Sequence, residues 1–238
     1  MKASIIFEND DFVSVNKEAG MLTIPDRYDD KQPSLYKILT QRYGKVFIVH
    51  RLDRDTSGLI LFAKNEPAHK YLSQLFEQRN IQKKYLGIVR GSMADKKGSV
   101  NEPIAEHPVK KGVMTISKKG KPSITDYEVL EDYGIYSLVQ FDIQSGRTHQ
   151  IRVHTQSLGH PIICDTVYGD GKPILLSSFK KKYKLSQHDL EERPIMRRLG
   201  LHSHSLHFKD SHRNEFSQEA PLPKDMKALL QQLKKNRG

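Results

Sequence analysis

Apolar residues near the start of the chain predict two short strands. The segments SIIFEND (4–10) and DFVSVNK (11–17) are rich in apolar and β-branched residues, and an Asn-Asp-Asp turn joins them. Gly20 follows in KEAGML, where a residue without a side chain can take backbone conformations that others resist. We therefore expect a hairpin followed by a loop beside a sheet edge.

Two segments have the 3.6-residue periodicity of helices. LYKILTQRY (35–43) places its apolar residues on one face, with Ser34 as a candidate N-cap and Gly44 as a stop. Asn65 is a second candidate cap, before a helix predicted over 68–79. Both predicted helices lie close to apolar strands, as in a mixed helix and sheet domain.

Further strands are predicted in the middle of the chain. VFIVH (46–50) and SGLILFAK (57–64) flank a charged turn, and KKYLGIVRG (83–91) is the next strand. Residues 91–122 are rich in glycine and lysine, which indicates short strands and loops. SITDYEVLE and IYSLVQFDI, within 123–143, form a predicted hairpin with period-two apolar positions.

The C-terminal third is less regular. Residues 169–194 have the composition of a charged surface insertion, and LGLHSHSLHF (199–208) has the pattern of a returning strand. A terminal helix is predicted within 221–238, where one apolar stripe contains Met226, Leu229, Leu230 and Leu233. The order of elements predicts an α+β fold in a single domain over residues 1–238.

Composition restricts the class of protein and its partners. The chain has 238 residues and 37% apolar content, enough for a sizeable core. Its single cysteine excludes an internal disulfide, and it contains no apolar run long enough to span a membrane and no signal-peptide pattern, so we expect a cytoplasmic protein. The net charge of +11 favours a polyanionic partner over a neutral metabolite.

The charged turn HRLDRDTSG (50–58) has two interpretations. Exposed ion pairs of this kind contribute about 0 to 1 kcal/mol each, and the five residues 51–55 alone favour that surface role. The turn lies, however, between two apolar strands, and Thr56, Ser57 and Gly58 suit a tight, hydrogen-bonded turn. A rigid turn beside a sheet is a common way to position a catalytic carboxylate.

Clustered histidines do not predict a metal site. In SGRTHQIRVH (145–154) the two histidines are five positions apart, whereas ligands on one helical face are three or four apart. On a strand, His202 and His204 share one face and His207 lies on the other. Hydrogen-bonded or solvated histidines are therefore expected, and no metal or other cofactor.

Four segments together resemble the RluA-type pseudouridine synthases, which isomerise uridine in ribosomal or transfer RNA. The segments are VNKEAG, HRLDRDTSGLILFAK, KKYLGIV and SGRTHQIRVHTQSLGHPIICDTVYG, and they occur in the family's order. The resemblance implies a mixed, mainly antiparallel bent sheet flanked by helices, with a central basic cleft. Within the family, the chain is similar to the compact members that lack an S4-type RNA-binding domain and act on both transfer RNA and large-subunit ribosomal RNA. Glu18 departs from the commoner VNKPAG.

The resemblance also implies roles for individual residues. Asp53 matches the catalytic aspartate, whereas Asp55 matches a position that the chemistry does not require. Tyr85 matches the tyrosine that stacks on the target base and is a candidate base in the proton transfers. Arg152 matches the arginine that pairs with the catalytic carboxylate, and Arg51 matches a residue that can fill the place of a flipped-out uridine. Neighbouring motif residues are assigned to RNA binding: His50, Thr56, Lys84, Arg147 and His149.

These residue types suit the reaction. The glycosidic bond of uridine must break, the uracil must turn, and a bond to C5 must form, without redox change. Asp53 could attack C1′, add to C6 or remove the proton at C2′, and the sequence leaves these paths open. A paired Arg152 would keep the buried carboxylate ionised. Extruding the base costs a few kcal/mol, and stacking on Tyr85 would return about 1 to 3 kcal/mol.

The expected partner is structured RNA, ribosomal or transfer, bound by a monomer. Lysines in or between the motif segments could neutralise phosphates; they are Lys83, Lys84, Lys110, Lys111, Lys118, Lys119 and Lys121. Two other classes remain open. One is an RNA-binding protein that has lost activity, and the other is a metal-dependent nuclease that uses Asp53, Asp55 and Asp165. The target uridine is not encoded in any pattern that we can interpret.

Overall fold

The backbone folds into two units, each assembled from separate stretches of the chain. The computed structural model describes residues 3–26, 29, 31–185 and 191–236. Unit 1 comprises Met1–Leu86, Asp142–Thr148 and Leu201–Pro221, and unit 2 comprises Gly87–Phe141, His149–Gly200 and Leu222–Gly238. The chain passes between the units several times, and the prediction of one catalytic domain over residues 1–238 stays a prediction.

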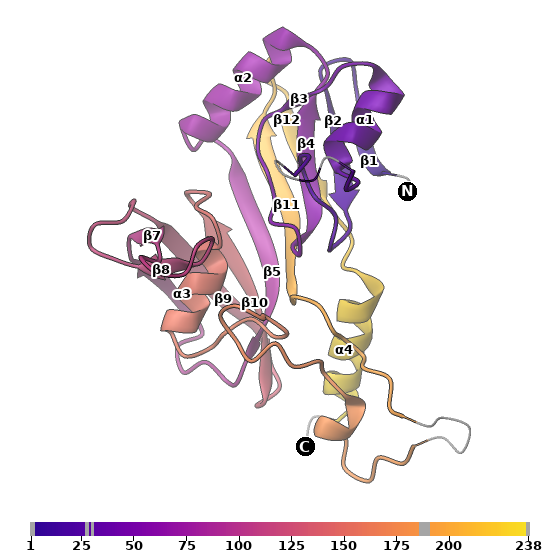
Figure 1. Ribbon diagram of the computed structural model, residues 1–238, viewed down its shortest axis with the longest axis vertical. Helices are drawn as coiled ribbons and strands as arrows, with labels where there is room; N and C mark the ends of the chain where they lie inside the picture. Colours follow the sequence, from indigo (N-terminus) through magenta and orange to yellow (C-terminus); the bar gives the residue numbers. More distant parts are fainter. Residues whose placement is uncertain (1–2, 27–28, 30, 186–190, 237–238) are drawn as a thin grey trace. The chain divides into compact units, whose positions relative to one another are not determined.

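Unit 1 is a sheet flanked by two helices (Figure 1). Its elements are β1 (Ser4–Glu8), β2 (Phe12–Lys17), α1 (Leu35–Tyr43), β3 (Phe47–Ile48), β4 (Ser57–Ala63), α2 (Glu66–Glu77), β11 (Leu201–Lys209), β12 (Glu215–Glu219) and the first residues of β5 (Gln82–Arg90). The strand order is β1-β2-β4-β11, with β3 paired to β4 and β12 to β11. The β4–β11 pair is parallel, whereas β1–β2, β2–β4, β3–β4 and β11–β12 are antiparallel.

The helices of unit 1 begin where the sequence predicts. The Ser34 side chain accepts a hydrogen bond from the Lys37 N–H, and α1 ends at Gly44, whose φ is 76°. The Asn65 side chain accepts from the Ala68 N–H and caps α2. The strand predicted over 46–50 is reduced to the two residues of β3. Cap chemistry therefore located the start of both helices, whereas α2 ends at Glu77, two residues before the predicted end at Arg79.

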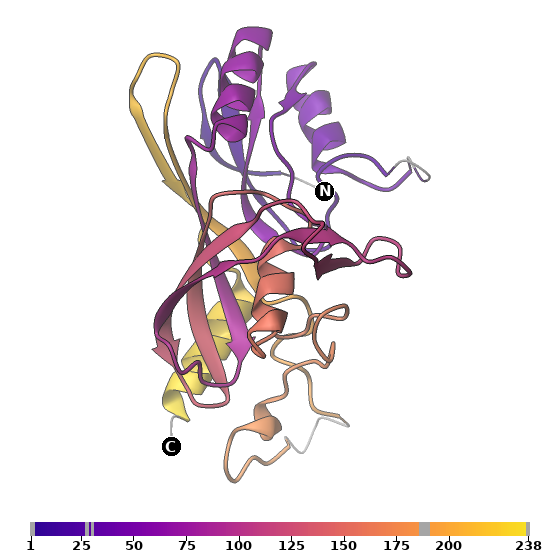
Figure 2. The same ribbon diagram turned by 90° about the vertical axis from the view of Figure 1, so that its left-hand side faces the viewer.

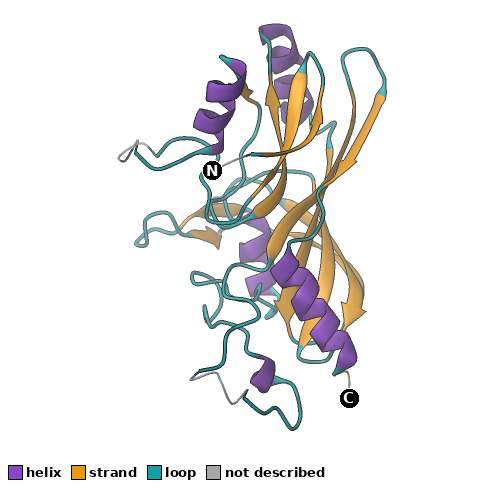
Figure 3. Ribbon diagram, turned by 90° about the vertical axis from the view of Figure 1, so that its right-hand side faces the viewer, coloured by secondary structure: helices purple, strands orange, loops and turns teal. Residues whose placement is uncertain are grey.

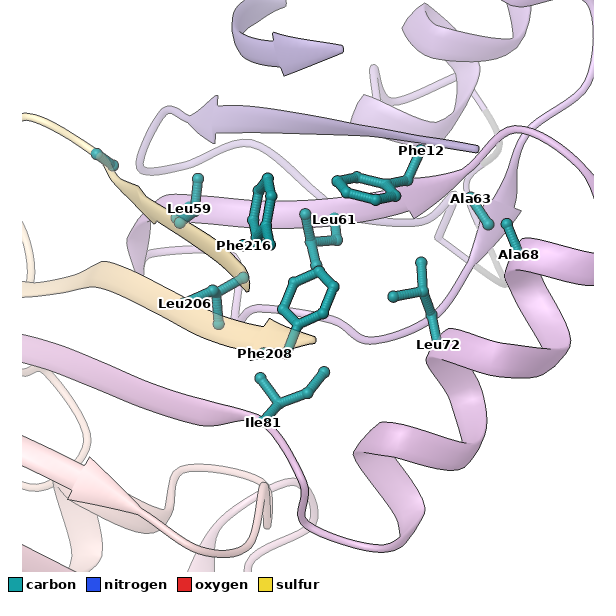
Figure 4. Close-up of a cluster of buried hydrophobic side chains, with 11 residues drawn as sticks. Phe12, Leu59, Leu61, Ala63, Ala68, Leu72, Ile81, Leu206, Phe208 and Phe216 are labelled. Carbon is teal, nitrogen blue, oxygen red and sulfur yellow. The ribbon is translucent and has the colours of Figure 1, made fainter. Parts of the chain in front are cut away.

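An aromatic cluster forms the core of unit 1 (Figure 4). Phe12, Phe208 and Phe216 are buried together, and the rings of Phe12 and Phe216 meet edge to face with centroids 5.0 Å apart. Phe216 belongs to β12, which the sequence analysis did not predict. The strand EFSQE contains one apolar residue and therefore has no alternating pattern to predict it. Its pairing with β11 and the packing of Phe216 stabilise it instead.

Unit 2 has its own strands and helices, with α3 against β9 (Figure 2). Its elements are the last residues of β5, β6 (Lys97–Asn101), β7 (Ile104–Glu106), β8 (Met114–Ile116), β9 (Ile124–Asp132), β10 (Tyr136–Ile143, apart from its last two residues), α3 (Gln150–Ser157), a 3₁₀ turn at Leu176–Ser178 and α4 (Lys224–Lys235). The strand order is β5-β10-β9-β6, and β7 and β8 form a separate antiparallel pair. The hairpin and the terminal helix predicted here are confirmed.

Loops dominate the stretch between α3 and β11, which is coloured teal in Figure 3. In the predicted insertion over 169–194, most described residues are exposed or half-buried, although Ile174 is buried. Residues 186–190 lie outside the described residues.

The terminal helix α4 buries Met226, Leu229 and Leu233. The Arg198 guanidinium donates two hydrogen bonds to the carboxylate of Asp225 in the first turn of this helix.

The α+β prediction is confirmed, including a mixed and mainly antiparallel sheet. The predicted basic cleft stays a prediction. Within the described ranges, no helix is both long and apolar enough to cross a membrane.

Candidate active site

The charged turn predicted from the sequence forms a closed backbone turn between β3 and β4. The Thr56 N–H donates to the Asp53 carbonyl at 3.2 Å, and Arg54 and Asp55 lie at its exposed tip. Asp53 is half-buried, whereas Asp55 is exposed. The two acidic residues therefore have different surroundings, and the inner one matches the aspartate that the resemblance selects.

Lys17, the last residue of β2, holds this turn. Its ammonium is buried, and it donates to the carbonyls of Arg54 and Met21 at 2.9 Å and of Glu18 at 3.1 Å. The Gly20 N–H also donates to the Arg54 carbonyl, at 2.8 Å. Three carbonyl acceptors offset much of the cost of burying a charge. The sequence analysis missed Lys17, although its place two residues after Val15 on the buried face of β2 was a usable signal.

Two threonines fix the residues beside Asp53. The Thr23 hydroxyl donates to the Leu52 carbonyl at 2.9 Å and accepts from the Leu52 N–H at 3.2 Å. Thr56 is buried at the other end of the turn. Both sides of Asp53 are thus held by short-range contacts, which limits the freedom of its backbone.

His50 is a neutral, packed side chain. Its Nε2 accepts from the Leu61 N–H at 3.0 Å, and its ring stacks on Phe76 with centroids 4.4 Å apart. Burial, assisted by the charge of Lys83, lowers the pKa of His50 to about 3. The ring is therefore uncharged at neutral pH, and its predicted role in RNA binding would depend on contacts other than charge.

Tyr85 lies on β5 within electrostatic reach of Asp53. It is buried and hydrogen-bonded to the Ser203 side chain. Burial raises the pKa of Tyr85 to about 12, with the Asp53 charge acting in the same direction and the Ser203 hydrogen bond opposing it. At pH 8 about one tyrosine in ten thousand is then ionised. In the free protein Tyr85 can therefore donate a hydrogen bond and offer its ring for stacking. It is a poor base, because the phenolate form is scarce at this pH.

The start of β11 fits tightly against the Ser57 and Gly58 segment. The Ser57 hydroxyl lies 2.9 Å from His202 Nδ1, and His202 Nε2 lies 3.2 Å from the Ala220 carbonyl. Because a carbonyl only accepts, Nε2 carries the proton and Nδ1 accepts from Ser57. Gly58 has φ +113°, and a Cβ there would lie 2.1 Å from the Ser203 carbonyl oxygen. Only glycine fits this approach, which the TSG pattern could not reveal without knowledge of β11.

Arg152 forms a buried ion pair in unit 2. Its Nε and Nη2 donate to the two Asp165 carboxylate oxygens at 2.7 and 2.8 Å, and the side chains are 6% and 0% exposed. Asp165 Oδ1 also accepts from the Val167 and Tyr168 N–H groups. Burial raises the pKa of Asp165, but Arg152 and these N–H groups together bring it below its ordinary value.

The predicted site residues divide between the units. Unit 1 contains Asp53, Tyr85, the exposed Arg51, the half-buried Lys84 and Arg147, and also His50 and Thr56. In unit 2, His149 is the N-cap residue of α3, and its Nδ1 lies 2.9 Å from the hydroxyl of Tyr168, whose ring lies under Arg152. The predicted pairing of Arg152 with Asp53 stays a prediction.

The histidines considered as metal ligands have hydrogen-bond partners. His154 lies between Thr125 Oγ1 and the Glu102 carbonyl, and burial lowers its pKa. His204 lies 3.2 Å from the Ala220 carbonyl, and His207 lies 3.2 Å from the Glu215 carboxylate. Among the described residues, no group of three or more histidine, cysteine or acidic side chains is arranged to hold a metal ion.

Comparisons with known proteins agree with these motifs. The RNA pseudouridylate synthase family pattern matches residues 11–157. "Ribosomal large subunit pseudouridine synthase D" of Nitrosomonas europaea is 35% identical over 236 residues, which cover 97% of this chain and 65% of that protein. The protein of the same name from Haemophilus ducreyi is 33% identical over 237 residues, which cover 97% of this chain and 70% of that protein.

Solved structures have the same fold. The structure of human RNA pseudouridylate synthase domain containing 1 matches with a TM-score of 0.70 and 26% sequence identity. The match covers 98% of this chain and 95% of the human chain. The human domain containing 4 protein has a TM-score of 0.73 at 23% identity, covering 97% and 93%, which shows the likeness of fold. The chain therefore belongs to the RNA pseudouridine synthase family of isomerases, which act on RNA.

Proposed function

We propose that this protein isomerises specific uridines to pseudouridine in large-subunit ribosomal RNA, transfer RNA or both, with Asp53 as the nucleophile and no cofactor. The observation that carries the proposal is the placement of Asp53: half-buried, on a turn held by Lys17 and Thr23, and within electrostatic reach of Tyr85. The names of the relatives support ribosomal RNA as a substrate, and the net charge of +11 supports a polyanion.

The properties of the residues suggest how the roles are divided. Asp53 would attack the sugar or the ring, and Tyr85 would stack on the extruded uracil as a protonated phenol. Arg152 would orient the catalytic carboxylate, as the resemblance implies. Arg51, exposed beside the turn, would fill the space left by the flipped base.

The remaining predicted residues would bind the RNA. Lys84 and Arg147 are half-buried and supply charges that phosphates attract. His149 and Thr56 would contact sugar or base edges through hydrogen bonds, and His50 would act as a neutral group. We expect a monomer in the cytoplasm, where ribosomal and transfer RNA are available.

Mapping of pseudouridine tests the proposed activity directly. The purified protein is incubated, in parallel with and without a chelator, with unmodified transfer RNA and unmodified large-subunit ribosomal RNA. Carbodiimide-dependent reverse-transcription stops then locate the product. We expect new stops at specific loop uridines. Binding without a stop on either RNA would favour an RNA-binding protein without activity, and RNA cleavage abolished by the chelator would favour a nuclease.

Substitutions of Tyr85 test its role as a stacking surface. Tyr85→Ala is expected to lower kcat/KM by about 5-fold to 150-fold, because stacking of a base on an aromatic ring contributes about 1 to 3 kcal/mol. Tyr85→Phe keeps the ring and should lose less than tenfold, since a phenol with a pKa near 12 is a poor base at neutral pH. A phenylalanine variant as impaired as the alanine variant would assign the hydroxyl an essential part in the chemistry.

A further inference from the structure

Lys83 is a buried lysine on the same face of β5 as Tyr85. It is 6% exposed, and alternation along the strand places it beside Tyr85, with Lys84 on the opposite face. Both Lys83 and Tyr85 belong to unit 1, as does Asp53. Lys83 is thus a neighbour of Tyr85 along β5 and belongs to the same unit as Asp53.

The surroundings of Lys83 combine an aromatic ring and a neutral histidine with the charges of two other residues. Its Nζ lies 5.9 Å from the centroid of the Phe76 ring, on which the uncharged His50 stacks. Burial lowers the pKa of Lys83, the charge of the Asp142 carboxylate opposes this effect, and the charge of Arg79 lowers the pKa further. The Asp142 carboxylate instead accepts a hydrogen bond from Gln82 Nε2 at 2.9 Å.

No described residue forms a hydrogen bond or a close ion pair with the Lys83 ammonium. The fold treats its other buried lysine differently, since Lys17 donates to three carbonyl oxygens. An ammonium on a largely buried side chain that has no protein acceptor is available to pair with an anionic ligand. Lys83 Nζ is also absent from the fully buried atoms that lack a partner, so the ammonium keeps access to solvent.

We propose that the Lys83 ammonium binds a phosphate oxygen of the substrate RNA next to the nucleotide that enters the site. The inference rests on the proposed function, because RNA is the ligand. An ammonium is a point charge with three donors, which suits phosphate. Uracil is neutral before the glycosidic bond breaks, whereas every nucleotide brings a full negative charge, so phosphate is the better ground-state partner.

Salt-dependent binding of in-vitro-transcribed large-subunit ribosomal RNA tests this contact. Lys83→Met keeps the apolar stem and removes the charge. Its affinity should fall about tenfold, and the slope of log K against log salt should decrease by about one. The control is Lys45→Met, which removes an exposed charge that donates to Glu66 at 2.9 Å. This control should change both quantities little.

Stability and kinetics separate this role from the alternatives. The Tm of Lys83→Met should stay equal or rise, because the substitution removes a partly desolvated charge that has no protein acceptor. Turnover should show a raised KM with kcat unchanged. Affinity and salt slope equal to those of Lys45→Met, a lowered Tm, or a lowered kcat at unchanged affinity would each overturn the proposal. The binding assay does not depend on turnover. If the wild-type protein proves inactive, the proposed function is refuted, but the affinity and the salt slope of Lys83→Met still test the phosphate contact.

Discussion

Asp53→Asn is expected to lower the rate of pseudouridine formation by at least about a thousandfold, while RNA affinity stays within about twofold. An amide lacks the negative charge and the nucleophilicity that the reaction requires. The turn should persist, because the bond that closes it joins the Thr56 N–H to the Asp53 carbonyl and not to the side chain. Single-turnover assays and filter binding on the same RNA measure the two quantities.

Asp55→Asn is the matched control. It makes the same chemical change two residues away, at the exposed tip of the turn. Its turnover should remain near that of the wild-type protein. A near-normal rate for Asp53→Asn would remove Asp53 from its assigned role, and equal losses in both variants would point to the charge of the turn as a whole.

Local patterns were sufficient for most of the elements. Ser34 and Asn65 cap the helices they were predicted to cap, because a cap depends on residues three positions apart in sequence. The strand β12 was missed because its five residues contain one apolar side chain and depend on pairing with β11. Local chemistry is readable from sequence, whereas a strand fixed by a distant partner is not.

The same distinction applies to the candidate site. Asp53, Tyr85 and Arg152 were selected from motifs and stay predictions, and the residues that contact the turn of Asp53 were not selected. His202 and Ser203 lie about 145 residues from Ser57 and Gly58 in sequence and contact them in space. No spacing rule links residues so far apart. The hydrogen bond between Ser57 and His202 is one of these long-range contacts.

The different surroundings of the two buried lysines, Lys17 and Lys83, could not have been predicted from the sequence. Lys17 and Lys83 both follow the alternation of buried strand positions, and a sequence shows both as charges near apolar residues. The structure separates a lysine with three carbonyl acceptors from one with none among the described residues. Whether a buried charge is structural or awaits a ligand depends on acceptors contributed by other elements.

Arg152→Met is expected to lower the free energy of unfolding by about 3 to 5 kcal/mol. The substitution leaves the Asp165 carboxylate, which is 0% exposed, without its bidentate partner. Urea denaturation measures the effect, and pH provides a check. Without Arg152, burial raises the pKa of Asp165 above its ordinary value of 3.8, so the carboxyl gains a proton as pH falls. The deficit against the wild-type protein should therefore be smaller at pH 5 than at pH 8, and a deficit independent of pH would contradict this explanation.

The double variant Arg152→Met with Asp165→Asn separates stability from catalysis. Asparagine keeps an oxygen that can accept from the Val167 and Tyr168 N–H groups and removes the unpaired charge, so most of the lost stability should return. If Arg152 also orients Asp53, turnover stays low in the stable double variant, because asparagine at 165 replaces none of the function of the guanidinium. If Arg152 serves only Asp165, turnover returns with stability. The two results assign Arg152 to the reaction or to the fold, a choice that its motif alone could not make.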